Sequence, residues 1–167
     1  WVCGQRDLIA DLRAHVGQIT QNGHAFLQQL YQDDSDAGVA LGFFNRFITV
    51  KDQPAYKGQI NMKHSGTMPL VQSLRLLALR EGVGETSTMG RLAALHGAGV
   101  LNDDEADYLR GAFEHLTNLL LQRQVADHRD GRKVANYVDP DALSERERDM
   151  LVDSFKAIKA LHGSRMQ

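Results

Sequence analysis

Two polar side chains of this sequence stand where a helical pattern calls for apolar ones. Arg123 follows Leu116 by seven residues and Gln124 follows Leu120 by four, so both continue the apolar stripe of one long helix. A guanidinium on the buried side of a helix must be paired or must face a cleft. We therefore expect Arg123 either to bond within a helical bundle or, with Gln124, to contact a ligand.

A second group of candidates precedes a helix that is predicted to begin near Pro69. Lys63 and His64 stand just ahead of Gly66, so two side chains that can carry positive charge come close to a helix N-terminus. Anions are favoured at such places. A solvated turn is the alternative, because the chain has no glycine-rich phosphate loop. Arg75, off the apolar stripe of that helix, either borders a phosphate site or is a surface charge.

Asn136 lies in the connection Ala-Asn-Tyr-Val-Asp-Pro that covers residues 135–140. Its amide is a candidate ligand contact, and the alternative is an Asx turn that satisfies the backbone of the connection. Arg91, at the start of a shorter predicted helix, is interpreted as a surface charge. These residues complete the candidate substrate-binding set, which is Lys63, His64, Arg75, Arg123, Gln124 and Asn136.

No catalytic or metal-binding pattern stands out. Asp34 and Asp36 have the spacing of a paired carboxylate motif, but no strand pattern surrounds them. The seven histidines include no i, i+4 pair and no HExxH motif, so we expect no zinc site. Cys3 is the single cysteine, which excludes an internal disulfide and indicates a reducing compartment, the cytoplasm. We expect no enzymatic activity from this chain by itself.

Composition limits the class of protein. The 167 residues, with 43% hydrophobic and 24% charged side chains, suit one globular domain, so 1–167 is expected to be a single helical domain. The formal net charge of -2 gives no basic excess for nucleic acid or an anionic membrane. No apolar run approaches the ~20 residues that cross a bilayer. The start at Trp1, without a capping signal, suggests a piece of a longer protein.

The elements that would position these residues are mostly helices. Apolar residues recur at helical spacing from Asp7 to Tyr31, with a break at 22–23, which predicts two helices followed by a loop at 33–42. Residues 47–50 and 59–62 are strand-like and flank a turn, which predicts one small β-hairpin. Only three prolines interrupt the chain, in keeping with a mainly helical fold.

Four later helices carry clearer signals. One begins near Pro69 and ends at 81–82, and a shorter one follows 86–88 and ends at 97–99. Asn102 and Glu105 form a capping signature for a long helix that runs to about 130. Ser144 and Glu147 form another for the last helix. The predicted fold is all-α in the main, a bundle of five or six helices with one small hairpin.

Motifs along almost the whole chain carry a resemblance to a known family. They are Leu12–Val16, Gly42–Phe47, Ile60–Gly66, Pro69–Val71, Arg75, Ala78–Leu79, Thr86–Thr88, Arg91–Leu92, Arg123–Gln124, Asn136–Pro140 and Leu143–Ser144. In these the chain resembles the C-terminal domain of bacterial nucleotidyltransferases of the DUF294 type, the nucleotidyltransferase substrate-binding domain. More distantly it is similar to the helical parts of the adenylyl- and uridylyltransferases of nitrogen regulation.

The resemblance implies a helical module that follows a catalytic nucleotidyltransferase domain, itself often preceded by a cyclic-nucleotide-binding-like domain and CBS domains. It implies Mg²⁺ and a nucleoside triphosphate for the parent protein and no cofactor in this chain. The chain departs from the family where it has Asn61 and Gln72 in place of acids and Gln122 in place of an arginine. Those departures bear on the activity of the parent and on how this member binds nucleotide.

Two functions from different classes follow. The favoured one is a non-catalytic module that helps a neighbouring nucleotidyltransferase domain bind a nucleotide or an acceptor substrate. The alternative is a regulatory or dimerisation module that couples sensory domains of a signal-transduction protein to the catalytic domain. An exposed apolar stripe on the Asp7–Tyr31 helices and a homodimer would favour the alternative. A pocket that brings Arg123 and Lys63 to solvent together would favour binding.

Overall fold

The computed structural model describes residues 4–23, 29 and 38–165. The second helix expected before Tyr31, the start of the loop at 33–42, and the pair Asp34 and Asp36 therefore lie outside the described residues. Five α-helices occur in the described part, which confirms a mainly α-helical fold. They are α1 (Arg6–Asn22), α3 (Met68–Arg80), α4 (Thr88–Gly97), α5 (Asp103–Arg129) and α6 (Glu145–Arg165).

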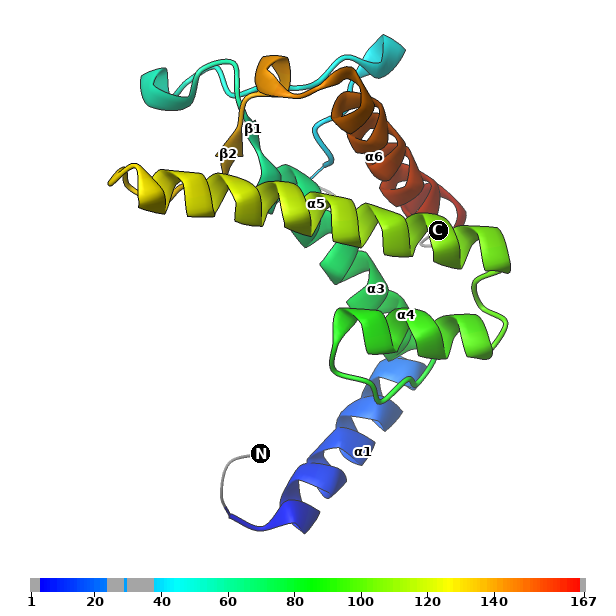
Figure 1. Ribbon diagram of the computed structural model, residues 1–167. Coiled ribbons are helices and arrows are strands. Elements are labelled where there is room, and N and C mark those ends of the chain that lie inside the picture. Colours follow the sequence, from blue (N-terminus) through cyan, green and yellow to red (C-terminus); the bar gives the residue numbers. More distant parts are fainter. Residues whose placement is uncertain (1–3, 24–28, 30–37, 166–167) are drawn as a thin grey trace.

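The two central helices are α5, which packs against α4, α6 and the segments 63–67 and 137–138, and α3, which packs against α1, α4, α6 and the segment 63–67. α6 packs along α5, α3 runs behind it, and α4 lies beside α3 (Figure 1). α1 extends away from the rest and contacts α3 (Figure 1). No helix in the described part is long and apolar enough to cross a membrane.

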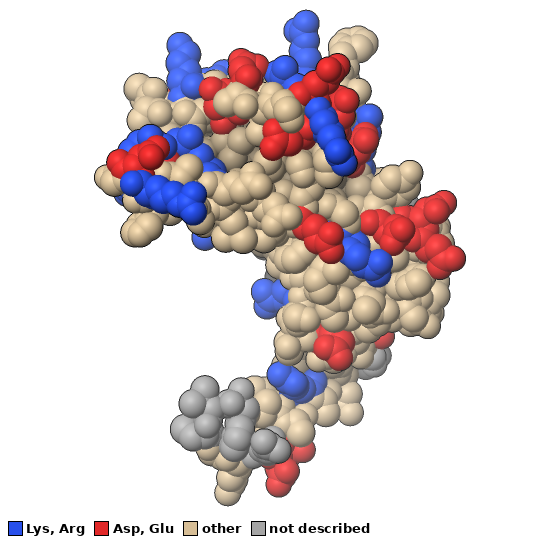
Figure 2. All heavy atoms as spheres, viewed as in Figure 1, with Lys and Arg blue, Asp and Glu red and all other residues tan. Residues whose placement is uncertain are grey.

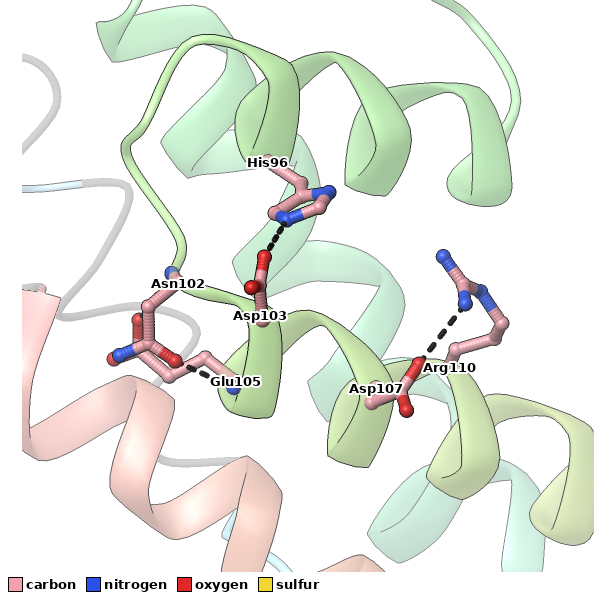
Figure 3. Close-up of polar contacts among 6 residues, drawn as sticks. All are labelled: His96, Asn102, Asp103, Glu105, Asp107 and Arg110. Carbon is pink, nitrogen blue, oxygen red and sulfur yellow. Dashed lines mark hydrogen bonds and ion pairs between the residues drawn. The ribbon is translucent and has the colours of Figure 1, made fainter.

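The predicted helix starts are confirmed by their caps. Asn102 Oδ1 accepts from the Glu105 N–H at 2.8 Å, and Glu105 Oε2 accepts from the Asn102 N–H at 2.9 Å. Ser144 and Glu147 form the same reciprocal pair ahead of α6. Figure 3 shows the Asn102–Glu105 capping pair turned toward α6. The pairs His96–Asp103 and Asp107–Arg110 lie on the side of α5 that faces α4. These local bonds satisfy backbone N–H groups that a helix start leaves without partners.

The core lies where α3, α4, α5 and α6 meet. Its fully buried side chains include Leu74 and Leu77 of α3, Leu95 of α4, Leu116 of α5 and Phe155 of α6. They correspond to the apolar stripes read from the sequence. The helices therefore form because each can bury one stripe against the others.

The small sheet does not have the predicted partners. β1 (Ile60–Asn61) pairs antiparallel with β2 (Tyr137–Val138), with Ile60 opposite Val138. Both of these side chains are buried, so the pairing places apolar residues of two distant segments in the core. Burial in the tertiary structure determines which two strands pair, and a local hairpin pattern in the sequence does not predict that pairing.

The segment 47–50, expected to pair with 59–62, bonds in part to residues 40–41 instead. Leu41 and Phe47 form an isolated antiparallel bridge, and the Ile48 N–H donates to the Ala40 carbonyl at 3.0 Å. Two bonds across the expected turn are present, from the Val50 N–H to the Gln59 carbonyl at 2.8 Å and from the Gly58 N–H to the Val50 carbonyl at 3.0 Å. The predicted hairpin is therefore corrected to a turn whose two sides pair with other parts of the chain.

A short π-helix, η3 (Lys63–Thr67), leads directly into α3, so the helical region begins before Pro69. Gly66 is buried in η3, and a Cβ there would lie 3.6 Å from Leu116 Cδ2 and 3.8 Å from Phe155 Cε1. Gly66, expected in a flexible turn, instead brings this helical turn close to α5 and α6. A π-helical turn is rare and is often found at functional sites.

A pH-dependent contact joins α3 to α6. The buried Ser73 hydroxyl donates to the Pro69 carbonyl at 2.5 Å, and Nε2 of His162 lies 2.5 Å from the same hydroxyl. Burial lowers the pKa of His162 below its usual value of 6.5, against an opposing effect of the Pro69 carbonyl. The folded state therefore favours the neutral imidazole.

This shift predicts a loss of stability in mild acid. Below pH 6.5 the unfolded chain takes up a proton on His162 that the folded chain resists, so the free energy of unfolding falls until the folded pKa is passed. We expect His162→Gln to flatten this part of the profile. Urea unfolding of both proteins between pH 7.5 and about pH 5 measures it. The exposed His128→Gln is the matched control, and an unchanged slope in His162→Gln would contradict the prediction.

Candidate functional site

Two of the predicted site residues meet at a junction of three segments. The Gln124 side-chain amide donates to Asn136 Oδ1 at 3.0 Å, and the Asn136 carbonyl accepts from the Met62 N–H at 2.8 Å. The first bond ties α5 to the segment before β2, and the second ties that segment to β1 and η3. Both polar side chains are half-buried. Asn136 therefore holds Gln124 with its side chain and Met62 with its backbone carbonyl, and neither bond is the Asx turn that the alternative expected.

Arg123 lies next to this junction and is partly paired. Its Nη2 lies 3.1 Å from Oδ1 of Asp127, one helical turn further along α5. The Asp127 side chain is only 1% exposed, whereas that of Arg123 is 35% exposed. The Nε of Arg123 is buried and has no hydrogen-bond partner. The guanidinium thus bonds within the bundle through Nη2, while its Nε is closed off from solvent.

Asp127 is a further residue of this site, one that the sequence patterns did not single out. Besides Arg123, it accepts from Arg132 Nε at 3.1 Å and from the Ala135 N–H at 3.3 Å. It therefore fixes the path of the chain from the end of α5 to Asn136. The signal was present, because Asp127 follows Leu120 by seven residues and Arg123 by four, which places it on the same stripe.

The electrostatics of Asp127 result from two opposing effects. Burial raises the pKa of its carboxyl group, but the bond from Arg132, the charge of Arg123 and the Ala135 N–H together outweigh burial and leave the pKa below its usual value. The same contact raises the pKa of Arg132. Asp127 is therefore a buried anion that is compensated by two guanidinium groups.

Lys63 and His64 stand at the beginning of η3, and both side chains are exposed. The His64 N–H donates to Asn61 Oδ1 at 3.1 Å, so Asn61 caps this turn without adding a negative charge. No ion pair joins Lys63 or His64 to a carboxylate within the described ranges. η3 contacts both α5 and β1, so these two residues belong to the same part of the molecule as the junction.

Arg75 is placed with α4. It is exposed on α3, and its charge acts on Arg91 of α4. Burial, and then the charge of Arg75, lower the pKa of Arg91. Arg91 is half-buried and donates from Nε to the Glu85 carbonyl at 3.0 Å, so it is more than the surface charge expected. Within the described residues, no hydrogen bond or ion pair joins Arg75 to the other five candidates.

Two hollows of the described surface lie elsewhere. One of about 510 Å³ lies between the start of α5 and the second half of α6, and one of about 770 Å³ lies between α6 and the loops at 45–49 and 140–141. None of the six candidate residues lines either hollow. Within residues 4–23, 29 and 38–165, no group of three His, Cys, Asp or Glu side chains could hold a metal ion.

The comparison with protein families gave one match. The family described as "Putative nucleotidyltransferase substrate binding domain" matches residues 24–165, which is most of the chain. No curated protein and no solved structure matched the sequence.

Replacement of Asp127 tests whether this carboxylate positions the junction. We expect Asp127→Asn to lower the midpoint of thermal unfolding markedly at pH 7, because two guanidinium groups lose their shared anion. The difference from wild type should shrink as pH falls toward the pKa of Asp127, since the wild-type carboxylate then becomes neutral too.

The matched control is Asp107→Asn, which removes an exposed carboxylate paired with Arg110 on the same helix. Exposed pairs of this kind contribute about 0–1 kcal/mol, so little change is expected. Equal effects of the two substitutions would contradict a positioning role for Asp127. Melting curves followed by circular dichroism between pH 3 and pH 7 decide between the outcomes.

Proposed function

The chain belongs to the family of nucleotidyltransferase substrate-binding domains, and from this premise we propose that it binds the phosphate-bearing part of a nucleotide or acceptor substrate. The proposed contact surface consists of Lys63, His64, Arg123, Gln124 and Asn136, and is called the α5 junction below. Arg75, placed with Arg91, is proposed to border it only through a ligand that extends toward α4. Catalysis belongs to a separate nucleotidyltransferase domain of a longer protein.

The state of Arg123 is the observation that carries this proposal. Asp127 fixes the orientation of the guanidinium, and about a third of the Arg123 side chain stays exposed to a ligand. A phosphate oxygen is the acceptor that a guanidinium binds most strongly. Lys63 and His64 on η3 add donors without a competing carboxylate. The surface therefore favours an anion over a cation or a neutral ligand.

The junction residues bind and orient, and they do not supply the groups that nucleotidyl transfer needs for catalysis. That reaction depends on carboxylates that hold a divalent ion bridging the phosphates. The described residues offer no such carboxylate set. Mg²⁺ and the triphosphate are therefore proposed to be held chiefly by the partner domain, in the cytoplasm, with this module holding the remaining part of the substrate.

One observation favours a second function, the regulatory or dimerisation module. α1 carries an apolar stripe that remains exposed, at 64% for Leu8, 61% for Leu12 and 51% for Ile19. The helix extends from the body (Figure 1), so the stripe is open to another helix. Exposed apolar patches of this kind mark interaction sites. In this reading α1 transmits the state of an upstream sensory domain.

A titration of the chain with ATP, GTP, CTP and UTP, each with and without Mg²⁺, tests the favoured function. Two-dimensional NMR spectra should show saturable shifts at Lys63, Arg123 and Asn136. Arg123→Gln should weaken binding by about tenfold or more, because a charged hydrogen bond contributes roughly 1.5–3 kcal/mol.

Arg110→Gln is the matched control, since it removes an exposed arginine at the other end of α5 and should leave affinity unchanged. Flat spectra with all four nucleotides at millimolar concentration would exclude nucleotide binding by the chain alone. The double change Leu8→Ser with Leu12→Ser separates the two functions. It removes apolar side chains of α1 and should leave nucleotide binding intact.

A further inference from the structure

The loop 42–47 presents two phenylalanine rings to solvent. Phe43 is 90% exposed and Phe44 is 95% exposed. Phe44 and Asn45 have φ angles of 56° and 58°, in the left-handed region that side chains other than glycine rarely adopt. Such strain persists where the surrounding structure holds the backbone in place, and it occurs at binding sites more often than elsewhere.

The loop is held at its base. The Gly42 N–H donates to the Arg46 carbonyl at 2.8 Å, and Phe47 packs edge-on against Phe155 of the core with ring centres 6.2 Å apart. Lys159 of α6 donates from Nζ to the Leu41 carbonyl at 2.5 Å. The loop that carries the two exposed rings is therefore already ordered. A partner that binds the rings loses little conformational entropy in fixing the loop.

An apolar recess lies further along α6. The hollow of about 510 Å³ is lined by Leu101, Leu109, Ala157 and Leu161, with Tyr108, which is 67% exposed, among its other lining residues. Its volume falls within the range of pockets that bind drug-sized apolar groups. Figure 1 shows the short helix at 43–45 beyond the N-terminal end of α6, and the start of α5 beside its C-terminal half.

The exposed face of α6 between these two features has a symmetric charge pattern. Asp149, Asp153, Lys156 and Ala160 are exposed and follow one another at intervals of four, three and four residues, on one side of the helix. In an antiparallel pair of such helices with a twofold axis between Asp153 and Lys156, each Asp153 faces Lys156 of the other copy. Asp149 faces Ala160, so no like charges oppose.

The positions along α6 also agree with this axis. Asp153 and Lys156 line both hollows, whereas Asp149 borders only the hollow at the loop and Ala160 only the apolar one. A half-turn about the midpoint of Asp153 and Lys156 therefore carries the loop of one copy toward the apolar hollow of the other. Figure 2 shows acidic and basic side chains interspersed on the upper part of the molecule, as mixed-sign pairing requires.

We propose that this face binds a second copy of the chain, with the α6 helices antiparallel and Phe43 and Phe44 of each copy in the apolar hollow of the other. The partner that fills the hollow is a second copy because one chain carries both the protruding rings and the recess. These two features lie on either side of a self-complementary charge pattern on α6. Within one chain Lys156 Nζ lies 3.4 Å from Asp153 Oδ1, and both side chains are more than half exposed. They can therefore exchange partners between copies.

Charge exchange at α6 tests the proposal. By sedimentation equilibrium the wild-type chain should be dimeric, and Asp153→Lys and Lys156→Glu should each be monomeric at the same concentration. When these two variants are mixed, every contact across the axis becomes complementary, so a heterodimer should form. Repair within one chain cannot explain that recovery, since each variant keeps like charges at 153 and 156.

Removing the rings of Phe43 and Phe44 tests the proposal independently of the charges on α6. The double change Phe43→Ser with Phe44→Ser should raise the dimer dissociation constant by roughly thirtyfold or more, as expected for aromatic anchors at an interface. Arg110→Glu is the control, since it reverses a charge of an exposed i, i+3 pair on the α4 side of α5 (Figure 3) and should leave the dimer intact. Circular dichroism confirms that each variant is folded.

A cross-link between copies adds a positive result. In a Cys3→Ser background, chains with Phe44→Cys mixed with chains with Tyr108→Cys should form a disulfide-linked heterodimer on oxidation. A wild-type chain that is monomeric up to millimolar concentration would overturn the proposal. So would a dimer that the α6 and phenylalanine variants leave unchanged, because the copies would then meet at another surface.

Discussion

A single buried carboxylate determines how the later half of the chain returns to the earlier half. Asp127 binds Arg123 on its own helix, Arg132 beyond the helix end and the N–H of Ala135. It thereby fixes the connection that carries Asn136 into β2, where it meets β1. A buried charge of this kind contributes little net stability over an apolar residue, but removing one partner leaves the others uncompensated. Its importance is therefore in fixing one arrangement.

The contrast with the exposed ion pairs shows why burial decides the outcome. Asp107–Arg110 has an N–O distance of 3.0 Å, close to the 3.1 Å of Arg123–Asp127, yet the carboxylate is 83% exposed in the first pair and 1% exposed in the second. Water screens the first pair and competes for its hydrogen bonds, so that pair has little effect on structure. The buried Asp127 carboxylate is shielded from solvent, so its bonds to Arg123, Arg132 and Ala135 meet little competition and can hold one arrangement.

The features that the sequence predicted correctly are those with local causes. The caps at Asn102 and Ser144 depend on residues three positions apart, so a short pattern is sufficient. The pairing of Ile60 with Val138 depends on burial of two segments far apart in the chain, and no local pattern reports it. Gln124 and Asn136 were each predicted as candidates, but their mutual bond depends on how the chain folds back after α5, which no short pattern reports. A lone Asp127 on a helical stripe does not stand out in the sequence, because its three partners meet it only once the chain has folded back after α5.

The position of α5 allows the described part of the chain to carry the proposed ligand surface and the proposed self-association surface without conflict. The helix has 27 residues, which at ~1.5 Å per residue is about 40 Å, and the proposed features lie at its two ends. Arg123 and Gln124 lie near its C-terminal end, whereas Leu101 and Tyr108 line the apolar hollow near its N-terminal end. Occupying the hollow covers none of the junction residues. A dimer formed through α6 would therefore leave both α5 junctions open, so nucleotide affinity and self-association should vary independently of each other.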